Sequence, residues 1–289
     1  MAEINADHAL RVFDAHVHIC FPDEIEYLWA QREPGNVRAT SMDQFYHFSK
    51  ENDVDSVVLI EAAASPVNIG REVALLDAIW RNDKKIAGII VGMDPDTAAA
   101  CGQINAYRDL ESVLGVRLLS RYARDTASFL VDHAQSVAKA CEAANLICEI
   151  GVWSQQLQCL KPLLSGAGDT RFILNHGGKP PSDNLGFQAW ARAIAEVAQS
   201  QNLTCKLSGF ASLLCSQSFA PEKFRPYLEV LYNEFGVERL IFGSDWHMIE
   251  EFASYNQVVS TISEVMDDID HGSSRRIFYD NAHAFYRRK

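Results

Sequence analysis

The sequence predicts an α/β fold, a single (β/α)8 TIM barrel that spans residues 1–289. Eight short apolar runs recur along the chain at a spacing of roughly 30 residues, which is the length of one strand–helix unit. The runs are almost continuous in apolar residues, as expected for strands that are buried on both faces of a parallel sheet. Helical patterns fill the intervals, and no linker-like tract divides the chain.

The predicted strands lie near residues 12–19, 55–62, 86–92, 115–120, 146–152, 171–176, 203–208 and 239–244. The helices between them carry local signals. Ser41 is followed three residues later by Gln44, the pattern of a capping box, and another helix has Pro221 near its start and Gly236 just past its end. A doubly wound open sheet is the alternative, but no glycine-rich phosphate loop follows any predicted strand.

Composition and charge limit the choice of partners. The formal net charge is −12, which argues against nucleic acid or an anionic membrane surface, because both require basic patches. The seven cysteines include no Cys-x-x-Cys pair and indicate free thiols in a reducing compartment. The N-terminal segment has no secretory signal, and no apolar run is long enough to span a membrane. We therefore expect a cytoplasmic protein that acts on a small molecule. The sequence allows a homodimer but does not decide the oligomeric state.

Several predicted strands end in side chains that bind metals or move protons. His16 and His18 lie two positions apart on the first strand and therefore share a face. His176 ends the sixth strand and Asp245 the eighth, with His247 close behind. Because active sites of barrels lie at the C-terminal ends of the strands, these groups should converge. Three imidazoles and a carboxylate suit one zinc ion with an open position, or they bind a carbonyl oxygen and activate water without metal.

Alternative roles exist for most of these residues. Arg117, Glu149 and Lys206 lie inside predicted strands, where they either bind substrate or pair as an ion network inside the barrel. Asp245 could instead cap a helix, and His176 could be a turn residue before two glycines. The structure decides between these roles by showing which side chains reach the mouth.

Two segments are candidates for the rim of the site. Residues 20–40 follow the first strand and include Phe21, Tyr27 and Trp29, aromatic side chains that can form a lid over a substrate. Residues 210–222 follow the seventh strand and form the second candidate rim.

Five motifs together resemble the amidohydrolase superfamily. They are "DAHVH", "NHGGKP", "CKLSG", "ERLIFGSDW" and "IFYDNAHAFYRR", in this order along the chain. The resemblance is greatest to the lactonase group, which includes sugar lactonases of the L-fuconolactonase and L-rhamnonolactonase type and 2-pyrone-4,6-dicarboxylate lactonase. It covers about residues 12–287. It implies a (β/α)8 barrel that hydrolyses a lactone ester.

The resemblance also implies roles for single residues. Four positions match the metal-binding and catalytic groups of the family: His16, His18, His176 and Asp245. Arg117 matches a substrate-binding arginine, and Lys206 lies within the "KLSG" motif. Some members of the family bind zinc and others act without metal. The resemblance therefore allows one divalent metal ion, such as zinc, but does not decide whether it is bound. No metal-bridging lysine is evident at a strand end, which argues against two metals. His247 stands where the family usually has proline.

The predicted reaction is attack of water on a lactone carbonyl. Asp245 takes the proton from the water, and the histidines polarise the carbonyl, with His176 among the catalytic groups. We place Arg117, Lys206, Glu149 and His247 with the substrate-binding residues. No G-x-S-x-G motif is present, so an acyl-enzyme is not expected. The alternatives are a metal-dependent nonoxidative decarboxylase on the same scaffold and a non-catalytic protein that binds sugar acids.

Overall fold

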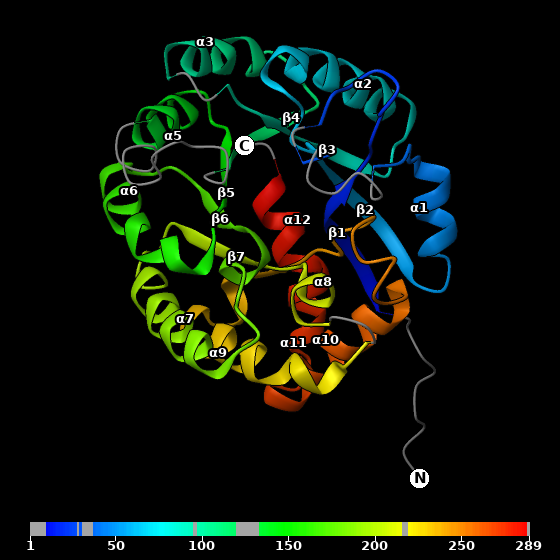
Figure 1. Cartoon of the computed structure of the whole chain (residues 1–289), viewed down its shortest axis with the longest axis vertical. Coiled ribbons are helices and arrows are strands. Elements are labelled where there is room, and N and C mark those ends of the chain that lie inside the picture. Colours follow the sequence, from blue (N-terminus) through cyan, green and yellow to red (C-terminus); the bar gives the residue numbers. More distant parts are fainter. Residues whose placement is uncertain are drawn as a thin grey trace.

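The eight predicted strands form one parallel sheet that curls into a barrel, so the predicted fold class is confirmed (Figure 1). The computed structural model describes residues 10–27, 29–30, 37–94, 97–119, 133–215 and 219–287. The strands follow the order of the sequence around the sheet. They are β1 (Arg11–His18), β2 (Asp53–Ile60), β3 (Ile86–Gly92), β4 (Val113–Leu119), β5 (Ile147–Gly151), β6 (Phe172–Leu174), β7 (Leu203–Leu207) and β8 (Leu240–Phe242).

The barrel closes through the segment that follows β8. Val17 of β1 forms a parallel bridge with Trp246. The His18 N–H donates to the Trp246 carbonyl at 2.7 Å, and the Asp245 N–H donates to the His16 carbonyl at 2.9 Å. The backbone that carries Asp245 is therefore hydrogen-bonded to the backbone that carries the two strand-one histidines, which fixes their relative position.

Helices surround the barrel and also close one of its ends (Figure 1). Around the outside lie α1 (Met42–Phe48), α2 (Ile69–Asn82), α3 (Thr97–Tyr107), α5 (Ala134–Ala143), α6 (Leu160–Gly166), α7 (Asn184–Val197), α9 (Arg225–Phe235) and α10 (Tyr255–Ile269). Shorter elements are α8 (Phe210–Leu214), α11 (Ser273–Arg275), α12 (Asn281–Tyr286), the π turn η8 (Arg276–Asp280) and the 3-10 turns η1 (Pro66–Asn68), η4 (Ser154–Cys159), η5 (Asn175–Gly178), η6 (Pro221–Lys223) and η7 (Val237–Arg239).

Local sequence signals explain several helix ends. Both hydrogen bonds of the predicted capping box are present at α1: Ser41 Oγ accepts from the Gln44 N–H, and Gln44 Oε1 accepts from the Ser41 N–H. Gly236 ends α9 with φ = 67°, a left-handed value that suits glycine. Pro221 begins the 3-10 turn η6 rather than α9, which starts at Arg225, so the predicted helix is two elements.

The barrel interior is apolar at its N-terminal end and polar toward its C-terminal end. The apolar cluster contains Phe13, Ala15, Val58, Ile60, Ile90, Leu114, Ile147, Ile173 and Ile241, together with Ala282 and Tyr286 of α12. The Tyr286 ring stacks on Phe13, with 5.9 Å between the ring centroids. Figure 1 shows α12 within the ring of strands. Because α12 closes this end, a ligand must enter at the C-terminal ends of the strands.

All seven cysteines are free, and five of them are buried, as expected for thiols in apolar surroundings. Within the described part of the chain, no helix combines the length and the apolar character needed to cross a membrane. Both candidate rims are described only in part. Residues 28 and 31–36 of the first rim, residues 216–218 of the second, and position 120 of the fourth predicted strand lie outside the described residues.

Candidate active site

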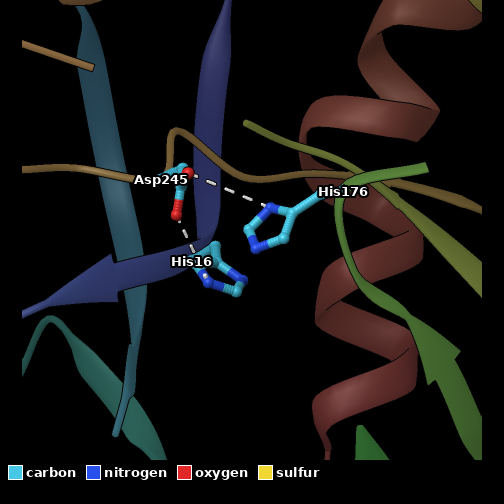
Figure 2. A group of neighbouring side chains, drawn as sticks. All are labelled: His16, His176 and Asp245. Carbon is cyan, nitrogen blue, oxygen red and sulfur yellow. Dashed lines mark ion pairs between the residues drawn. The ribbon is translucent and has the colours of Figure 1, made fainter. Parts of the chain in front are cut away.

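The three elements that were predicted to converge do so at the C-terminal mouth. Figure 2 shows Asp245 facing both His16, from β1, and His176, from the turn after β6, with an ion-pair contact to each. His176 and Asp245 adopt left-handed backbone conformations with φ of 55° and 66°. Such values are uncommon for residues other than glycine and occur often at functional sites. The turn conformation aims both side chains back over the barrel.

Asp245 is not a helix cap, so that alternative is wrong. The next helix, α10, begins ten residues later and is capped by Ser254. Asp245 Oδ1 instead lies 3.6 Å from the Nε2 atoms of both His16 and His18. Asp245 Oδ2 lies 4.0 Å from His176 Nδ1. His176 occupies a turn, as the alternative proposed, but its side chain still faces the carboxylate.

Asp14 links β1, which carries His16, to the segment after β8, which carries Asp245. Nothing in the sequence alone indicates this role. Its Oδ1 accepts hydrogen bonds from the backbone N–H groups of His16, at 3.1 Å, and Ser244, at 2.8 Å. Its Oδ2 accepts from the Tyr255 hydroxyl at 3.0 Å. Asp14 is completely buried. It therefore holds the backbone on both sides of the site, at His16 and at the residue before Asp245.

A directional chain of hydrogen bonds orients the two strand-one histidines. His18 Nδ1 lies 3.0 Å from the Ile60 carbonyl and must carry a proton to donate to it, which leaves Nε2 as an acceptor. His16 Nε2 lies 3.2 Å from this acceptor. On the other side of the ring, His16 Nδ1 lies 3.3 Å from Lys206 Nζ. A lysine ammonium only donates, so the chain runs from Lys206 through His16 and His18 to Ile60, and it places the His16 proton on Nε2.

Lys206 and Glu149 form an ion pair inside the barrel. Lys206 Nζ donates to Glu149 Oε1 and to the Ala15 carbonyl, both at 2.8 Å. The Tyr286 hydroxyl donates to the same Glu149 oxygen at 2.8 Å. Both charged side chains are completely buried and lie outside the wall of the mouth cavity. This position supports the interior ion network rather than the substrate contact that we predicted for them.

Arg117 forms its ion pair with Glu61, whereas the predicted ion network inside the barrel would pair it with Glu149. One of its terminal nitrogens, Nη1, donates to Glu61 Oε1 and to the Glu61 carbonyl, each at 3.1 Å. The second carboxylate oxygen of Glu61 accepts the backbone N–H of Ala63, and Glu72, on α2, accepts the backbone N–H of Ala62. Since Arg117, Ala62 and Ala63 all line the cavity, these carboxylates shape one wall of it.

The mouth holds a cavity of about 230 Å³. Its lining includes His18, Arg117, His176, Asp245 and His247 from the predicted site residues. Sequence reasoning placed Trp29 in the first candidate rim and Ser212 and Leu213 in the second, and it missed the remaining lining residues: Ala62, Ala63, Leu119, Trp153, Lys179, Gly209 and Met248. Of the three aromatic residues named for the predicted lid, Trp29 lines the cavity and Phe21 and Tyr27 do not. The Tyr27 hydroxyl instead accepts a hydrogen bond from the Phe21 N–H.

Gly209 is needed where the backbone after β7 passes the site. Its φ is 69°, and a Cβ added there would lie 2.8 Å from His176 Nδ1 and 3.2 Å from Asp245 Oδ2. The preceding residue, Ser208, contacts His176 Nδ1 through Oγ at 2.9 Å. Three residues of the "KLSG" motif thus contact or flank the site: the lysine orients His16, the serine contacts His176, and the glycine leaves room for the side chains of His176 and Asp245.

Burial determines the charge state of the site. Burial lowers the pKa of His176 to about 3, although Asp245 opposes the shift. Burial and then the charge of Lys206 lower the pKa of His16 well below its ordinary value. Burial alone would raise the pKa of Asp245, but His176, His18 and Arg117 outweigh it and lower the pKa. At neutral pH the site therefore contains an ionised carboxylate beside the neutral imidazoles of His16 and His176.

The donor set has the spacing of a mononuclear metal site. Tetrahedral zinc with ligands at about 2.0–2.2 Å needs ligand atoms about 3.3–3.6 Å apart. His16 Nε2, His18 Nε2 and Asp245 Oδ1 are separated by 3.2, 3.6 and 3.6 Å. His176 also offers a ligand atom within 4.8 Å of those of His16 and Asp245. These residues fit one metal ion, provided that His16 Nε2 gives up the proton that Lys206 favours there.

His247 lies in the cavity wall on the segment that follows β8. It is 6% exposed, and burial lowers the pKa of its imidazole to about 4. The backbone of His18 is close enough to oppose this lowering of the pKa, but neither ring nitrogen has a hydrogen-bond partner among the described residues. The peptide bond between Trp246 and His247 is cis.

Comparisons with known proteins agree with this architecture. A protein-family model described as amidohydrolase matches residues 13–288. The L-fucono-1,5-lactonase of Burkholderia multivorans is 24% identical to this chain over 270 residues, which cover 88% of each protein. A crystal structure of an amidohydrolase from Burkholderia multivorans with bound zinc superposes with a TM-score of 0.83 at 21% identity, covering 95% of this chain and 98% of that one.

More distant structures share the fold as well. The 5-carboxyvanillate decarboxylase of Sphingomonas paucimobilis superposes with a TM-score of 0.67 at 12% identity, covering 97% of this chain and all of that one. At such identities the superpositions establish the barrel, and the match of the family model to almost the whole sequence establishes the relationship. This chain belongs to the amidohydrolase family.

Proposed function

We propose that this enzyme is a lactonase, which opens the ring of a sugar-type lactone by direct attack of water on the ester carbonyl. The observation that carries this proposal is the geometry of Asp245, an ionised and buried carboxylate that faces three imidazoles at the mouth of the barrel. Relatives named as L-fucono-1,5-lactonase and L-rhamnono-gamma-lactonase support the assignment of the substrate class.

Asp245 is the general base in this mechanism. It accepts a proton from the attacking water, and it lies within 4.0 Å of the imidazoles that must contact the carbonyl oxygen. The lowered pKa of Asp245 keeps the carboxylate ionised at neutral pH, but it also makes the carboxylate a weak base. The reaction therefore requires a carbonyl that the protein polarises strongly.

The imidazoles supply this polarisation. In the hydrogen-bond chain, the His16 Nε2–H donates to His18 Nε2 at 3.2 Å, and a bound carbonyl oxygen would replace His18 as its acceptor. Lys206, at Nδ1 on the other side of the ring, maintains that tautomer. A donor placed at the developing oxyanion lowers the free-energy barrier to attack. Arg117 lines the same cavity and has a buried Nε without a hydrogen-bond partner among the described residues, so it is suited to binding a substrate oxygen.

His16, His18 and Asp245, with His176 nearby, would hold a zinc ion, which supplies Lewis-acid polarisation of the carbonyl and lowers the pKa of bound water. Arg117 binds and orients the substrate in either case, whereas the His16 Nε2–H donor is present only in a metal-free site. Lys206 and Glu149 act on the reaction only through the orientation of His16, and we assign them as positioning residues.

The test is hydrolysis of a panel of sugar lactones, followed through acid release with a pH indicator, with the metal content of the same sample measured. Asp245→Asn should lower the turnover number by about 10²–10⁴-fold while the Michaelis constant changes little. Asp43→Asn, an exposed change of the same kind on α1, is the matched control. A folded Asp245→Asn enzyme with nearly full activity would refute the role of Asp245. Release of CO₂ from aromatic acids without lactone hydrolysis would favour the decarboxylase instead.

A further inference from the structure

His247 is a buried polar side chain that faces a cavity without a hydrogen-bond partner. Its ring is 6% exposed and contributes to the cavity wall. Nδ1 and Nε2 are both buried, and neither makes a hydrogen bond of ordinary geometry to the residues that the structure describes, although the His18 backbone is near enough to raise the pKa of the ring. Buried polar groups are nearly always hydrogen-bonded, because an unpaired one loses its hydration without compensation. Two unpaired nitrogens on one ring at the wall of a cavity therefore indicate a group that a ligand completes.

The chemistry of the imidazole restricts what that ligand offers. In either neutral tautomer the ring has one N–H donor and one acceptor nitrogen. An alcohol hydroxyl both donates and accepts, so it pairs with whichever nitrogen faces it. A carboxylate only accepts hydrogen bonds, so it pairs with the N–H of the ring alone, and it would also lie near the acidic side chain of Asp245, two residues away. A hydroxyl group on an uncharged ring is therefore the better match.

The surroundings of His247 suit a ring with one polar edge. The Trp29 indole lies beside the imidazole, with 6.4 Å between the ring centroids, and it also lines the cavity. The indole N–H is already used, because it donates to the Ala62 carbonyl at 2.7 Å, which fixes the orientation of Trp29. The apolar face of Trp29 is thus held in place next to a free polar group, the arrangement that receives the C–H face and a hydroxyl of a sugar-like ring.

We propose that His247 is a specificity-determining residue that binds one ring hydroxyl of the substrate, with Trp29 packed against the ring beside it. This inference rests on the proposed lactonase function. It adds that the site recognises a ring hydroxyl of the lactone, which the proposed function does not specify. His247 follows the general base by two residues on the same segment, so the hydroxyl lies close to the reacting carbonyl. The enzyme then discriminates hydroxylated lactones from unsubstituted ones by this hydrogen bond.

The test measures binding separately from turnover. Hydroxylated δ-lactams of the fucono, rhamnono and glucono configurations, with unsubstituted δ-valerolactam for comparison, bind without a hydrolysable ester and are titrated by calorimetry. Wild type should bind at least one hydroxylated lactam about 10-fold or more tightly than δ-valerolactam. His247→Phe keeps a ring against Trp29 and should reduce this affinity ratio by about 10-fold, because the ligand hydroxyl loses its hydrogen-bond partner. His247→Asn retains a donor and an acceptor and should keep more of the ratio.

His47→Phe is the matched control, because His47 is exposed on α1 and lies outside the cavity. It should leave the affinity ratio unchanged. Equal affinities of wild type for hydroxylated and unsubstituted lactams, no binding of any hydroxylated lactam, or an unchanged ratio in His247→Phe would each overturn the subsite. Lactone hydrolysis is measured on the same samples. Its absence in wild type would refute the lactonase function, whereas the lactam affinity ratio decides on His247 alone.

Discussion

Replacement of Lys206 by methionine tests whether the ion pair inside the barrel is one energetic unit. Lys206 Nζ and Glu149 Oε1 are 2.8 Å apart, and both side chains are completely buried. Methionine retains most of the length and apolar volume of lysine, but it leaves the Glu149 carboxylate without a counter-charge. Breaking a buried pair in this way costs about 3–5 kcal/mol, a large part of the roughly 5–15 kcal/mol by which folded proteins are stable.

The assay is unfolding in urea together with a thermal scan. At about 2 °C per kcal/mol for a chain of this size, Lys206→Met should lower Tm by roughly 6–10 °C. The double variant Lys206→Met/Glu149→Gln has no unpaired charge, and the amide oxygen introduced at position 149 can still accept from Tyr286, so most of the stability should return. Its turnover number should remain low, because His16 Nδ1 has still lost its donor.

Two results would refute this reasoning. A loss below about 1 kcal/mol in Lys206→Met would mean that Glu149 is neutral or hydrated in the folded protein. A double variant with restored stability and full activity would mean that Lys206 does not orient His16. Separate measurement of stability and turnover is therefore essential, because the single variant lowers both.

Three further predictions concern the cavity wall and the metal ligands. Burial, with repulsion from Glu61, raises the pKa of Glu72 to about 8, so the folded protein retains a proton that the unfolded chain releases near pH 4.5; between about pH 7 and 8, above the range in which the buried histidines of the site contribute, stability to urea should fall as pH rises, and Glu72→Gln should flatten this slope. Gly209→Ala should lower turnover at least tenfold and destabilise by about 1–3 kcal/mol, because its Cβ would lie 2.8 Å from the His176 ring at a left-handed φ; a fully active variant would contradict the close approach. Zinc titrated against a chromophoric chelator should bind one per chain, and His16→Gln should weaken it at least tenfold; equal affinity would remove His16 from the ligands.

The strands could be predicted because their burial is visible in the sequence. A strand that is covered on both faces needs a nearly continuous apolar run, and the predicted and observed strands agree within a few residues. The largest differences at strand ends include β6 and β8, which both end before the predicted boundary. After both strands the backbone turns into left-handed conformations, at His176 and Asp245. Those turns depend on contacts across the mouth, so the local sequence does not reveal them.

The convergence of the candidate site residues could be predicted from a topological rule, whereas the residues that support them could not. His16, His18, His176 and Asp245 stand at strand ends, and the barrel brings all strand ends together. Asp14 acts through partners more than 200 positions away in the sequence, and the partner of Arg117 proved to be Glu61 rather than Glu149. Such pairings depend on the face of each strand and on the register between neighbours, which a single sequence does not specify.

The pKa of Asp245, the proposed general base, bears on which carbonyl the site is suited to attack. Neighbouring imidazoles and Arg117 keep the Asp245 pKa below its ordinary value, so this carboxylate removes a proton only weakly. Most of the lowering of the barrier must then come from the electrophile, through donors such as His16 Nε2–H, and from the intrinsic reactivity of the substrate. A lactone ester has a more electrophilic carbonyl and a better leaving group than an amide. A weakly basic carboxylate is therefore better suited to ester opening than to amide cleavage, and for this reason the lactams are chosen as ligands that should bind without being cleaved.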